Sequence, residues 1–590
     1  MIKTPKIIQR TANPAVLEAA KQLGLSDLQA SLVANRLENT DQLEQIVFPK
    51  LKHIQHPRDL KNSEQASKLI ANAINDNGVI VLATDYDTDG VTSAWVAKTA
   101  LVDYFGVPKE RVIHIIGERK SGYGITDEVV DRIIDIPKKI SLVISADQGS
   151  SDEPRIARLK ESGIKVCVTD HHQLPLEGTP PSASCTVNPQ QAGCNYDKTV
   201  AGCYVIFLVM TQVRQTLIEM GQLPKDTVSL KALAMNVALG TVADSVSLKS
   251  PNNRAIVLTG LHYINQFQSP AWQAMKQLNN NQGQAFDAEF LGFQVATRIN
   301  AASRVSDVTT AFHFLTSSSV QQAEIYLEQL DSDNINRRSQ QDTMLQQAKQ
   351  IAEESYHPDK YSLTIRMQGN AGIQGIIASR IGEQYGLPTI AMTDLGDGFI
   401  AGSGRGIVAN IDLREAFQWM SEQHEGLFVS MGGHAGAAGC MIPEDNFAVF
   451  TELFEQAVQN QLGDEAPTPI IETDGELQGW QLTPQLIDEL QALEPYGREW
   501  PKPLFSNDFT ISDAKFVGQD KTHLSLKLIT NDSQRISAIY FNVREVGDST
   551  EPFTRGDKIT CVFQPSLNIY YGRTSLQLRL VSAKVKIDIR

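Results

Sequence analysis

The stretch that decides the fold is Val79–Gly90, VIVLATDYDTDG, in which an apolar run leads directly into three aspartates. The apolar part, Val79–Ala83, has the length and the branched side chains of a buried β-strand. Asp85, Asp87 and Asp89 follow at every second position, so at a strand end their side chains can point to one side. The pattern predicts a buried strand that delivers several carboxylates to one edge of a sheet.

The same arrangement recurs along the chain, where apolar runs end in Asp147 and in Asp170-His171-His172, and Asp244 follows a helical stretch. Alternation of short apolar runs with helical stretches is typical of a parallel sheet covered on both faces. The expected strands are Val79–Ala83, Val112–Ile116, Leu142–Ala146 and Val166–Thr169, and the expected helices are Thr92–Tyr104, Glu153–Ser162 and Val200–Met220. Because the C-terminal ends of parallel strands open into one crevice, we expect the acidic and imidazole side chains to meet there.

Carboxylates gathered in one crevice would repel one another strongly unless cations lay between them. Oxygen ligands with imidazole suit Mn²⁺ or Mg²⁺, and two such ions about 3.5–4 Å apart would activate water at a phosphoryl group. Taken singly, each aspartate could instead cap a helix or form a turn, and DYDTDG could belong to a calcium loop, although the glutamate at its twelfth position is missing. Three separate motifs at strand ends favour the metal site.

The remainder of the chain divides into further parts. The polar stretch 316–355 predicts a long solvated helix, with its N-cap in the serines before Val320. A second α/β unit follows, and after Phe509 five alternating strands predict a small barrel. The predicted fold class is α/β with a C-terminal β-barrel, divided into a helical N-terminal extension (1–60), a parallel-sheet domain (61–315), the connecting helix (316–355), the second α/β domain (356–462) and the barrel domain (463–590).

Composition narrows the class of protein. A chain of 590 residues exceeds one hydrophobic core, and 42% hydrophobic with 21% charged residues is ordinary for a globular protein. No apolar run reaches the roughly 20 residues that cross a bilayer, and the N-terminus lacks a signal-peptide core, so we expect a cytoplasmic protein without membrane contact. The six scattered cysteines are expected to be reduced, buried thiols. A net charge of −15 argues against a broad basic surface for duplex DNA but permits a narrow basic channel.

Four motifs, in this order, carry a resemblance to a known family: DYDTDG (85–90), ADQG (146–149), DHH (170–172) and GTVADSV (240–246). They resemble the signature motifs of the DHH phosphoesterase superfamily. The RecJ branch, with its DHH-associated domain and C-terminal OB-fold, is further resembled by FPKLKHIQHP (48–57), RINAASR (298–304), GIIASRI (375–381), GSGRG (402–406) and GGHAGAAG (432–439). The likeness covers nearly the whole chain.

The resemblance implies a two-metal phosphodiesterase with a role for each acidic motif. The implied metal ligands are Asp85, Asp87 and Asp147 around one ion, and Asp89, Asp147, His171 and Asp244 around the other. His172 would be a catalytic residue beside the second ion, where the histidine would bind the phosphate or assist proton transfer. The alternative role of His172 is to pair with a buried carboxylate. Asp170 would orient a histidine.

The implied substrate-binding residues lie in both α/β parts. Arg119, Ser403 and Arg405 resemble the family's pocket for a 5′-terminal phosphate, although a tight turn is the plain alternative for the glycine-rich segment around Arg405. His434 would approach the substrate as a second catalytic residue, and Gly433 would allow close backbone contact. The remaining implied substrate contacts are Arg298, Asn300, Arg304 and Arg380, with helix capping or a domain interface as the alternative for an arginine.

In the barrel, aromatic residues alternate with basic ones, as in OB-folds that bind single strands by stacking and charge. The candidate stacking residues are Phe516, Tyr540, Phe541, Phe563, Tyr570 and Tyr571, and the basic residues among them are Lys515, Lys527, Arg535 and Arg573. Alternate strand positions must face inward, so some of these aromatic side chains are expected in the core.

The chain departs from the family's usual pattern at several positions. Asn370 lies in a segment that usually contains histidine, Ser303 replaces a usual glycine, and Gly436 replaces a larger residue. The segment EPYGREWPKP (494–503) replaces a turn with glycine and asparagine. None of these departures removes an implied metal ligand, and we expect their effects on processivity, end preference or partner contacts.

The resemblance thus implies a monomeric 5′-to-3′ exonuclease that degrades single-stranded DNA in DNA repair and recombination. It also suggests a RecQ-type helicase and a single-stranded-DNA-binding protein as partners. One alternative is a DHH phosphodiesterase for short oligonucleotides or cyclic dinucleotides, but such enzymes typically stop after two domains. A second is a DHH scaffold that binds single strands without cutting; its mark would be loss of the carboxylates, and here all are present.

Overall fold

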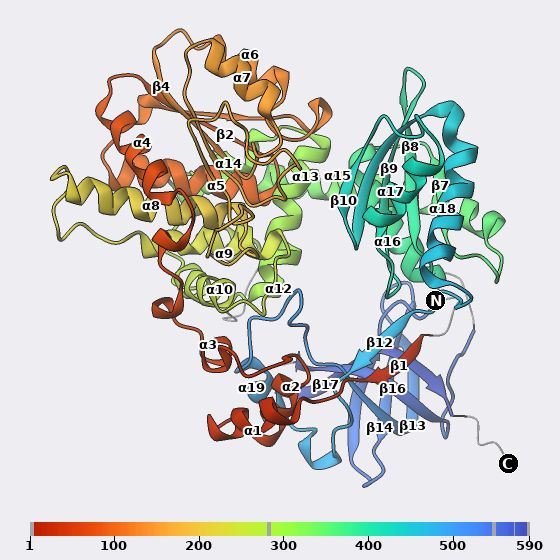
Figure 1. Cartoon of the computed structure of the whole chain (residues 1–590). Helices are drawn as coiled ribbons and strands as arrows, with labels where there is room; N and C mark the ends of the chain where they lie inside the picture. Colours follow the sequence, from red (N-terminus) through yellow and green to blue (C-terminus); the bar gives the residue numbers. More distant parts are fainter. Residues whose placement is uncertain (1–4, 280–284, 545–549, 571–572, 587–590) are drawn as a thin grey trace. The chain divides into compact units, whose positions relative to one another are not determined.

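The computed structural model describes residues 5–279, 285–544, 550–570 and 573–586 (Figure 1). The chain divides into two compact units, of which the larger contains Lys50–Ile470 and the smaller combines Ile7–Pro49 with the chain from Ile471 onward. The larger unit holds two sheets with their helices, and the smaller holds a closed barrel.

The first sheet has the strand order β3-β2-β4-β5-β6, and every neighbouring pair is parallel. Its strands are β2 (Val79–Thr84), β3 (Val112–Ile116), β4 (Ile140–Ala146), β5 (Val166–Thr169) and β6 (Cys185–Val187). Four of them are those expected from the sequence, and β6 is a further short strand at one edge. The strands β2, β4 and β5 are neighbours, so the loops that follow them open at one edge of the sheet.

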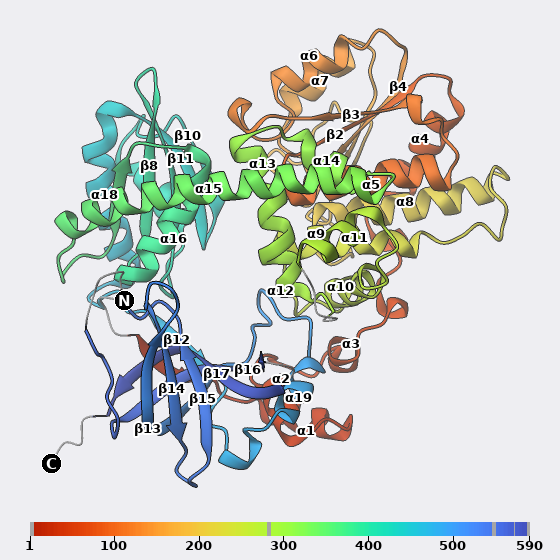
Figure 2. The same cartoon turned by 180° about the vertical axis from the view of Figure 1, so that it is seen from behind.

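Helices cover both faces of this sheet, as the two opposite views show (Figures 1 and 2). One face packs against α6 (Asp127–Ile134) and α7 (Glu153–Glu161). The other face contacts α4 (Ser63–Asn75), α5 (Thr88–Thr99) and α8 (Gly202–Glu219). Because both faces are covered, all six residues of β2 are buried, which explains the continuous apolar run in the sequence.

Helix α5 differs from its sequence-based prediction at both ends. It begins at Thr88 rather than Thr92, because Asp87 caps it and the aspartate loop forms its first turn. Its predicted last residues, Ala100–Tyr104, form a π-helical turn.

A helical region follows the first sheet and leads into the connecting helix. Its helices are α9 (Ala234–Ala243), α10 (Pro251–Ile264), α11 (Pro270–Leu278), α12 (Ala288–Phe290), α13 (Thr297–Val305) and α14 (Thr309–Leu315), with a π-helical turn at Leu291–Ala296. The connecting helix is α15 (Val320–Ser355), and the side chain of Ser319 accepts a hydrogen bond from the backbone N–H of Gln322. The N-cap that the serine run predicts is therefore confirmed.

The second sheet has the order β10-β11-β9-β8-β7, in which β7 and β8 are parallel and the other pairs are antiparallel. Its strands are β7 (Leu363–Met367), β8 (Thr389–Gly396), β9 (Phe399–Arg405), β10 (Ser430–His434) and β11 (Ala437–Pro443). The helices α15 and α16 (Gln374–Tyr385) pack in one core cluster with β7, and α17 (Leu413–Gln423) and α18 (Phe447–Leu462) pack in another with β9 and β11. The glycine-rich segment that includes Arg405 is thus part of strand β9 rather than a tight turn.

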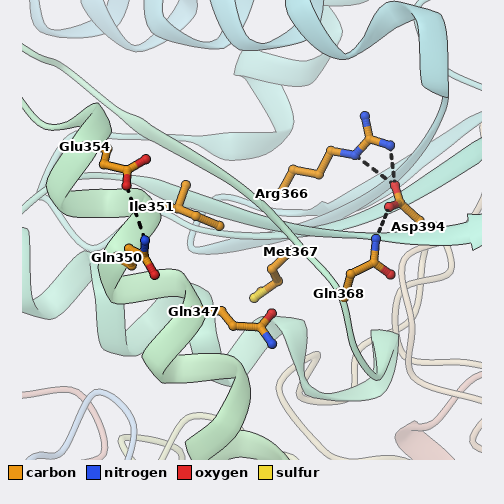
Figure 3. A pocket seen from close by; sticks show the side chains of 8 residues that line it. All are labelled: Gln347, Gln350, Ile351, Glu354, Arg366, Met367, Gln368 and Asp394. Carbon is orange, nitrogen blue, oxygen red and sulfur yellow. Dashed lines mark hydrogen bonds and ion pairs between the residues drawn. The ribbon is translucent and has the colours of Figure 1, made fainter.

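A polar groove of about 530 Å³ runs between α15 and β7 (Figure 3). The guanidinium group of Arg366 pairs with Asp394 at 2.7 Å, and the amide of Gln368 donates to the same carboxylate at 2.6 Å. On the helix side, Gln350 donates to Glu354 at 3.4 Å. The charged side chains that line the groove are therefore already engaged with one another.

The smaller unit is built on a closed barrel with the strand order β13-β14-β15-β17-β16. Its strands are β13 (Phe505–Val517), β14 (His523–Ile529), β15 (Arg535–Tyr540), β16 (Lys558–Tyr570) and β17 (Arg573–Val585). The same unit contains a two-stranded sheet and short helices, which are β1 (Lys6–Gln9), β12 (Ile470–Thr473), α1 (Pro14–Gln22), α2 (Asp27–Ala34), α3 (Leu43–Val47) and α19 (Gln485–Gln491). A buried ion pair between Arg36 and Asp474, 2.8 Å apart, fastens the N-terminal helices to the barrel.

The barrel sorts the aromatic residues that the sequence offers for base stacking. Phe563 is fully buried against Phe505 and Phe509, so its prediction as a stacking residue is wrong: its strand position faces the core. Phe541 is 42% exposed and Phe516 is half-buried, so both remain candidates, as does the half-buried Tyr540. Tyr571 and the side chains of Tyr570 and Arg573 lie outside the described residues.

Among the helices of the described segments, none combines the length and the apolar character that a membrane span needs.

Candidate metal centre

The loop after β2 is shaped by its own aspartates. The carboxylate of Asp87 accepts hydrogen bonds from the backbone N–H groups of Asp89 (2.9 Å) and Gly90 (3.1 Å), which starts α5. A Cβ at Gly90 would lie 2.3 Å from the carbonyl oxygen of Asp85, so only glycine lets the helix begin this close to the strand end. Asp85 and Asp89 are almost fully buried. The loop therefore holds these two carboxylates inside the molecule, with Asp87 partly buried.

Asp147 follows β4 and has a backbone φ of 61°, in the left-handed region that residues other than glycine seldom adopt. Its side chain is buried, and its Oδ1 accepts no hydrogen bond from the part of the chain that the structure describes. The start of α8 comes close, since a Cβ at Gly202 would lie 2.6 Å from this oxygen. A strained residue with an unsatisfied buried oxygen indicates a functional position.

Asp89 lies at the N-terminus of α8. Its carboxylate oxygens accept hydrogen bonds from the backbone N–H groups of Gly202 (2.7 Å) and Cys203 (2.9 Å). These are N–H groups without partners inside the helix, and the positive end of the helix dipole favours a carboxylate there. Helix α9 packs equally close, because a Cβ at Gly240 would lie 2.8 Å from Asp89 Oδ1.

His171 brings the loop after β5 to the same place. Its Nε2 lies 3.2 Å from Asp147 Oδ1, and it is 3.8 Å from Asp89 Oδ2 and 3.7 Å from Asp244 Oδ2. Asp244 is the C-cap residue of α9. Like Asp147 Oδ1, His171 Nε2 is buried and has no hydrogen-bond partner among the described residues. Residues from four separate elements thus converge on one position.

Three sets of side chains each place their ligand atoms within 4.8 Å of one another: Asp85 with Asp87 and Asp147, Asp89 with His171 and Asp244, and Asp147 with His171 and His172. We call the six residues Asp85, Asp87, Asp89, Asp147, His171 and Asp244 the carboxylate cluster. The structure brings together all six residues that the sequence predicts as ligands. Carboxylate oxygens with one imidazole nitrogen form a donor set that fits hard divalent cations.

The electrostatics of the cluster point the same way. Burial raises the pKa of Asp147 well above its usual range, and repulsion from Asp89 and Asp87 raises it further. Burial and the neighbouring Asp87 likewise raise the pKa of Asp85, and burial and Asp89 raise that of Asp87. Charges that are costly together become favourable around cations, because a divalent ion reverses the sign of the local field.

Beside the cluster, Asp170 holds the two histidines. Its carboxylate accepts hydrogen bonds from the backbone N–H groups of His171 (2.7 Å) and His172 (3.2 Å), and it lies 2.8 Å from His172 Nδ1. Burial alone would lower the pKa of His172, but Asp170 and the more distant carboxylates of Asp244 and Asp87 outweigh burial and raise it to about 9. The structure therefore pairs His172 with a buried carboxylate, the alternative that the sequence left open.

Two side chains near the histidines carry no signal in the sequence pattern. The hydroxyl of Tyr123 lies 2.8 Å from His172 Nε2 and donates to the backbone carbonyl of Asp147 at 3.3 Å. The amide of Asn188, fully buried after the short strand β6, donates to the carbonyl of His172 and to the hydroxyl of Ser150, both at 2.9 Å. A three-residue strand is too short to be visible as a pattern, so Asn188 could not be singled out.

Two arginines lie next to the aspartate loop. The guanidinium carbon of Arg119 lies 4.4 Å from the ring centroid of Tyr86, and an amino group of Arg119 is 3.4 Å from Ser303 Oγ. The guanidinium group of Arg304 donates to the carbonyl of Gly372, in the loop that precedes α16. No ion pair engages Arg119 or Arg304 within the described ranges. We call Arg119 and Arg304 the arginine cluster.

Arg298 and Asn300 are engaged within the protein. Arg298 donates to Asp331 of α15 at 2.8 Å and to the carbonyl of Gln294 at 2.6 Å. The side-chain oxygen of Asn300 accepts hydrogen bonds from the backbone N–H and the hydroxyl of Thr88, both at 2.8 Å. Asn300 therefore holds the first turn of α5, which carries Asp89.

In the second sheet, Arg405 and Ser403 lie against the start of α16. Arg405 donates to Ser403 Oγ at 3.1 Å, and a Cβ at Gly375 would lie 2.4 Å from its guanidinium group. Burial lowers the pKa of Arg405. His434 and Gly433 are exposed at the end of β10, and Arg380 is exposed on α16. The structure thus separates the half-buried Arg405 from these exposed positions.

The departures from the family pattern also find their places. Asn370 donates to the carbonyl of Arg304 and to Gln340 of α15, at 3.0 and 3.1 Å. Ser303 accepts the contact from Arg119 and donates to the carbonyl of Asn300 at 3.2 Å. Gly436 lies in the turn between β10 and β11, next to the ring of His434. Two of the departures thus surround the arginine cluster.

Comparison with known proteins agrees with this architecture. Family models match the DHH family N-terminal domain at residues 79–241, the DHHA1 domain at 360–460 and the RecJ OB domain at 473–582. The single-stranded-DNA-specific exonuclease RecJ of Haemophilus influenzae is 31% identical over 560 residues, which are 92% of this chain and 94% of that protein.

Solved structures show the same fold. The crystal structure of RecJ in complex with Mn²⁺ from Thermus thermophilus aligns with a TM-score of 0.78 at 23% identity, over 98% of this chain and 79% of that one. A crystal structure of exonuclease RecJ bound to manganese aligns with a TM-score of 0.55 at 27% identity, over 68% of this chain and 94% of that one.

A parallel sheet with acidic motifs at its strand ends, followed by a DHHA1 domain, defines a member of the DHH superfamily. Within it, the chain belongs to the RecJ family.

Proposed function

We propose that this protein is a 5′-to-3′ exonuclease that degrades single-stranded DNA by two-metal-ion hydrolysis of phosphodiesters. The observation that carries the proposal is the convergence of the carboxylate cluster at the ends of β2, β4 and β5. The relative from Haemophilus influenzae is named a single-stranded-DNA-specific exonuclease, which supports this substrate class. We assign catalysis to residues 61–315, the second half of the site to 356–462, and strand binding to 463–590, with 1–60 as a helical N-terminal extension and 316–355 as the connecting helix.

The cluster would hold two Mn²⁺ or Mg²⁺ ions. We assign one to Asp85, Asp87 and Asp147 and the other to Asp89, His171 and Asp244, with Asp147 shared. Asp147 Oδ1 and His171 Nε2 are buried without a hydrogen bond to any described residue, which supports this assignment, as does the manganese bound in a solved RecJ structure. A pair of such ions supplies a water of lowered pKa and a Lewis acid for phosphoryl oxygens.

His172 is positioned for acid–base work or for contact with the scissile phosphate. Because the Asp170 carboxylate lies 2.8 Å from Nδ1, it would hold the proton on that nitrogen and orient the ring. The hydroxyl of Tyr123 contacts Nε2 at 2.8 Å, and Tyr123 is 52% exposed. A substrate phosphate at Nε2 would replace the phenol or accept a hydrogen bond from it.

Recognition of the 5′-terminal phosphate is assigned to Arg119, Ser403 and Arg405, and Arg304 would grip the sugar-phosphate of the strand. Arginines without ion pairs are suited to an anion, and Arg119 Nε is a buried donor with no partner among the described residues. Such a grip on the end phosphate would give the enzyme its polarity. His434, Gly433 and Arg380 are exposed and would contact the strand, whereas Arg298 and Asn300 are engaged within the protein, so their direct contact with substrate stays a prediction.

In the barrel, the exposed ring of Phe541 is the foremost candidate for base stacking. It packs edge-on against His523 at 5.2 Å, with the guanidinium carbon of Arg579 at 5.5 Å from its centroid. Phe516 lies under Arg544, whose guanidinium carbon is 3.4 Å from the ring centroid. Aromatic rings bordered by cations are how OB-folds bind single strands without reading sequence.

The proposed substrate also bears on location and partners. An enzyme acting on chromosomal single strands in repair and recombination would work as a monomer in the bacterial cytoplasm. It would take strands opened by a RecQ-type helicase and compete or cooperate with single-stranded-DNA-binding protein.

Digestion of end-labelled single strands of both polarities, with Mn²⁺, Mg²⁺ or a chelator, tests the proposal. We expect mononucleotides released from the 5′ end, only with metal, and faster from 5′-phosphorylated ends. Preferred cleavage of dinucleotides or cyclic dinucleotides would favour the smaller DHH phosphodiesterases instead, and strand binding without cleavage would indicate a scaffold. The presence of the barrel and of every carboxylate favours the exonuclease over both.

A further inference from the structure

Tyr86 occupies an unusual position between two members of the carboxylate cluster. It stands directly between Asp85 and Asp87, at the end of β2, and is 8% exposed. Unlike its neighbours Asp85 and Asp87, Tyr86 supplies no carboxylate to the cluster. It points instead to the arginine cluster, where Arg119 lies 4.4 Å from its centroid.

Among the described residues, the Tyr86 ring is the closest support of the Arg119 guanidinium group. The guanidinium group makes one further polar contact there, a long one to Ser303 Oγ at 3.4 Å. Its Nε is buried without a partner, and no carboxylate of the described residues lies within ion-pairing distance. An arginine on a partly desolvated aromatic face is held flat by the ring quadrupole while its N–H edges stay free for a planar anion.

The surroundings of the ring restrict it in turn. Tyr123 packs edge-on against Tyr86, with centroids 6.5 Å apart. The backbone before α16 also comes close, since a Cβ at Gly372 would lie 3.5 Å from the Cδ of Arg119. Arg119 therefore contacts the Tyr86 ring through its guanidinium group and lies close to the loop that precedes α16 through its aliphatic stem.

We propose that Tyr86 is a positioning residue that sets specificity for the 5′-phosphate: its ring orients Arg119 for the terminal phosphate and keeps that contact in register with the carboxylate cluster. The inference rests on the proposed exonuclease function and adds to it a residue whose only action is through Arg119. It follows that loss of the ring should impair end recognition, whereas loss of the hydroxyl alone should not.

The test compares Tyr86→Phe, Tyr86→Leu and Tyr86→Met with the full-length parent protein. For each we would measure kcat and KM on 5′-phosphorylated and 5′-hydroxyl single strands, together with the Mn²⁺ concentration for half-maximal activity. We expect Tyr86→Phe to keep the end preference. In the Leu and Met variants the ratio of kcat/KM values should fall about tenfold, through KM for the phosphorylated strand, because a desolvated cation–π contact is lost. The Mn²⁺ requirement should not change.

Tyr196→Leu is the matched control, since it removes another buried tyrosine of the same domain, and no arginine of the described residues lies over the ring of Tyr196. It should change thermal stability and leave end preference intact. In an Arg119→Ala background, Tyr86→Leu should produce no further loss of preference.

Several results would overturn the inference: an unchanged ratio in the Leu and Met variants, equal losses on both ends, or a raised Mn²⁺ requirement. Failure of both variants to fold would also overturn it, by making Tyr86 a core residue. If the parent protein itself showed no exonuclease activity or no preference for 5′-phosphate, the proposed function would fail first, and the two failures are thus distinguishable.

Discussion

The two sheets of the larger unit concentrate opposite charges: the first sheet carries carboxylates and the second an arginine. The first sheet is wholly parallel, and its central strands deliver Asp85, Asp147 and His171 to one edge, where burial raises the pKa of both carboxyl groups. The second sheet is mostly antiparallel and presents Ser403 and Arg405 on β9 beside glycines, without a carboxylate paired to Arg405 among the described residues.

Each sheet therefore concentrates one kind of charge. The first sheet gathers carboxylates at one edge, and the second holds an arginine that forms no ion pair with the described residues. In the proposed function a phosphodiester with divalent ions would suit both, because the ions would neutralise the carboxylates and the phosphate would pair with the guanidinium groups. Strand direction therefore affects how many charged side chains can meet. The ends of parallel strands bring several loops together, whereas the edge of an antiparallel hairpin exposes single side chains.

The largest effect is expected from breaking the first side of the comparison. Asp147→Asn should lower kcat by about 10⁴-fold or more, because the ligand that the two proposed metal ions share is lost. Strand binding should be retained and measured by fluorescence anisotropy. The exposed Asp135→Asn serves as the control. Activity within tenfold of the parent would contradict the shared-ligand role.

A smaller loss is expected where the carboxylate acts through a histidine. Asp170→Asn removes the negative charge beside His172 Nδ1, so the pKa of His172, raised to about 9, should fall, and activity should drop about 100-fold. The pH profile of kcat and a double variant with His172→Ala check this. If the two losses simply multiplied, Asp170 would be acting elsewhere than through His172.

The role of the second sheet can be tested by comparing two of its arginines. Arg405→Ala should reduce the preference for a 5′-phosphate about tenfold, the value of one charge-assisted hydrogen bond. Arg366→Ala is the matched control, because Arg366 is already paired with Asp394 and Glu444. It should alter stability without altering end preference. Equal losses on phosphorylated and hydroxyl ends would refute the assignment of Arg405.

The smallest effect concerns stability without metal. The pKa values of Asp85, Asp87 and Asp147 are raised in the folded state, so their stabilising contribution is present below the ordinary value of 3.8 and is lost as pH rises through the raised values. The metal-free protein should therefore lose stability with rising pH more steeply than Asp147→Asn. Mn²⁺ at about 100 times its Kd should restore about 2.7 kcal/mol. Thermal unfolding with and without chelator measures both, and identical pH slopes for the two proteins would argue against the buried repulsion.

The candidate site could be predicted from the sequence to the extent that it depends on strand ends. The sequence shows apolar runs that end in Asp85, Asp147 and Asp170-His171. Strands buried on both faces are continuously hydrophobic, so these runs can be recognised as strands. The C-terminal ends of parallel strands lie at one edge of the sheet, so the acidic residues can be predicted to meet there. The connecting helix and the five barrel strands follow from equally local periodicities.

Partner choice escaped prediction. The sequence does not reveal that Arg298, predicted to bind the strand, also donates to Asp331 of α15. Nor does it reveal that the position of Phe563 in β16 faces the core. The roles of Asn188 and Tyr123 depend on contacts with residues far along the chain, at His172 and Asp147.

The sequence alone determined which elements form and which acidic side chains end them, since both depend on local periodicity and on the connection rules of parallel sheets. Three contacts are visible only in the tertiary structure. The guanidinium group of Arg119 lies over the ring of Tyr86, and the carboxylate of Asp170 binds His172 Nδ1. Arg405 has no counter-charge among the described residues. The physical reason is that an ion pair, a stacked ring or an orphaned donor is defined by distance in space, and separation along the chain does not encode that distance.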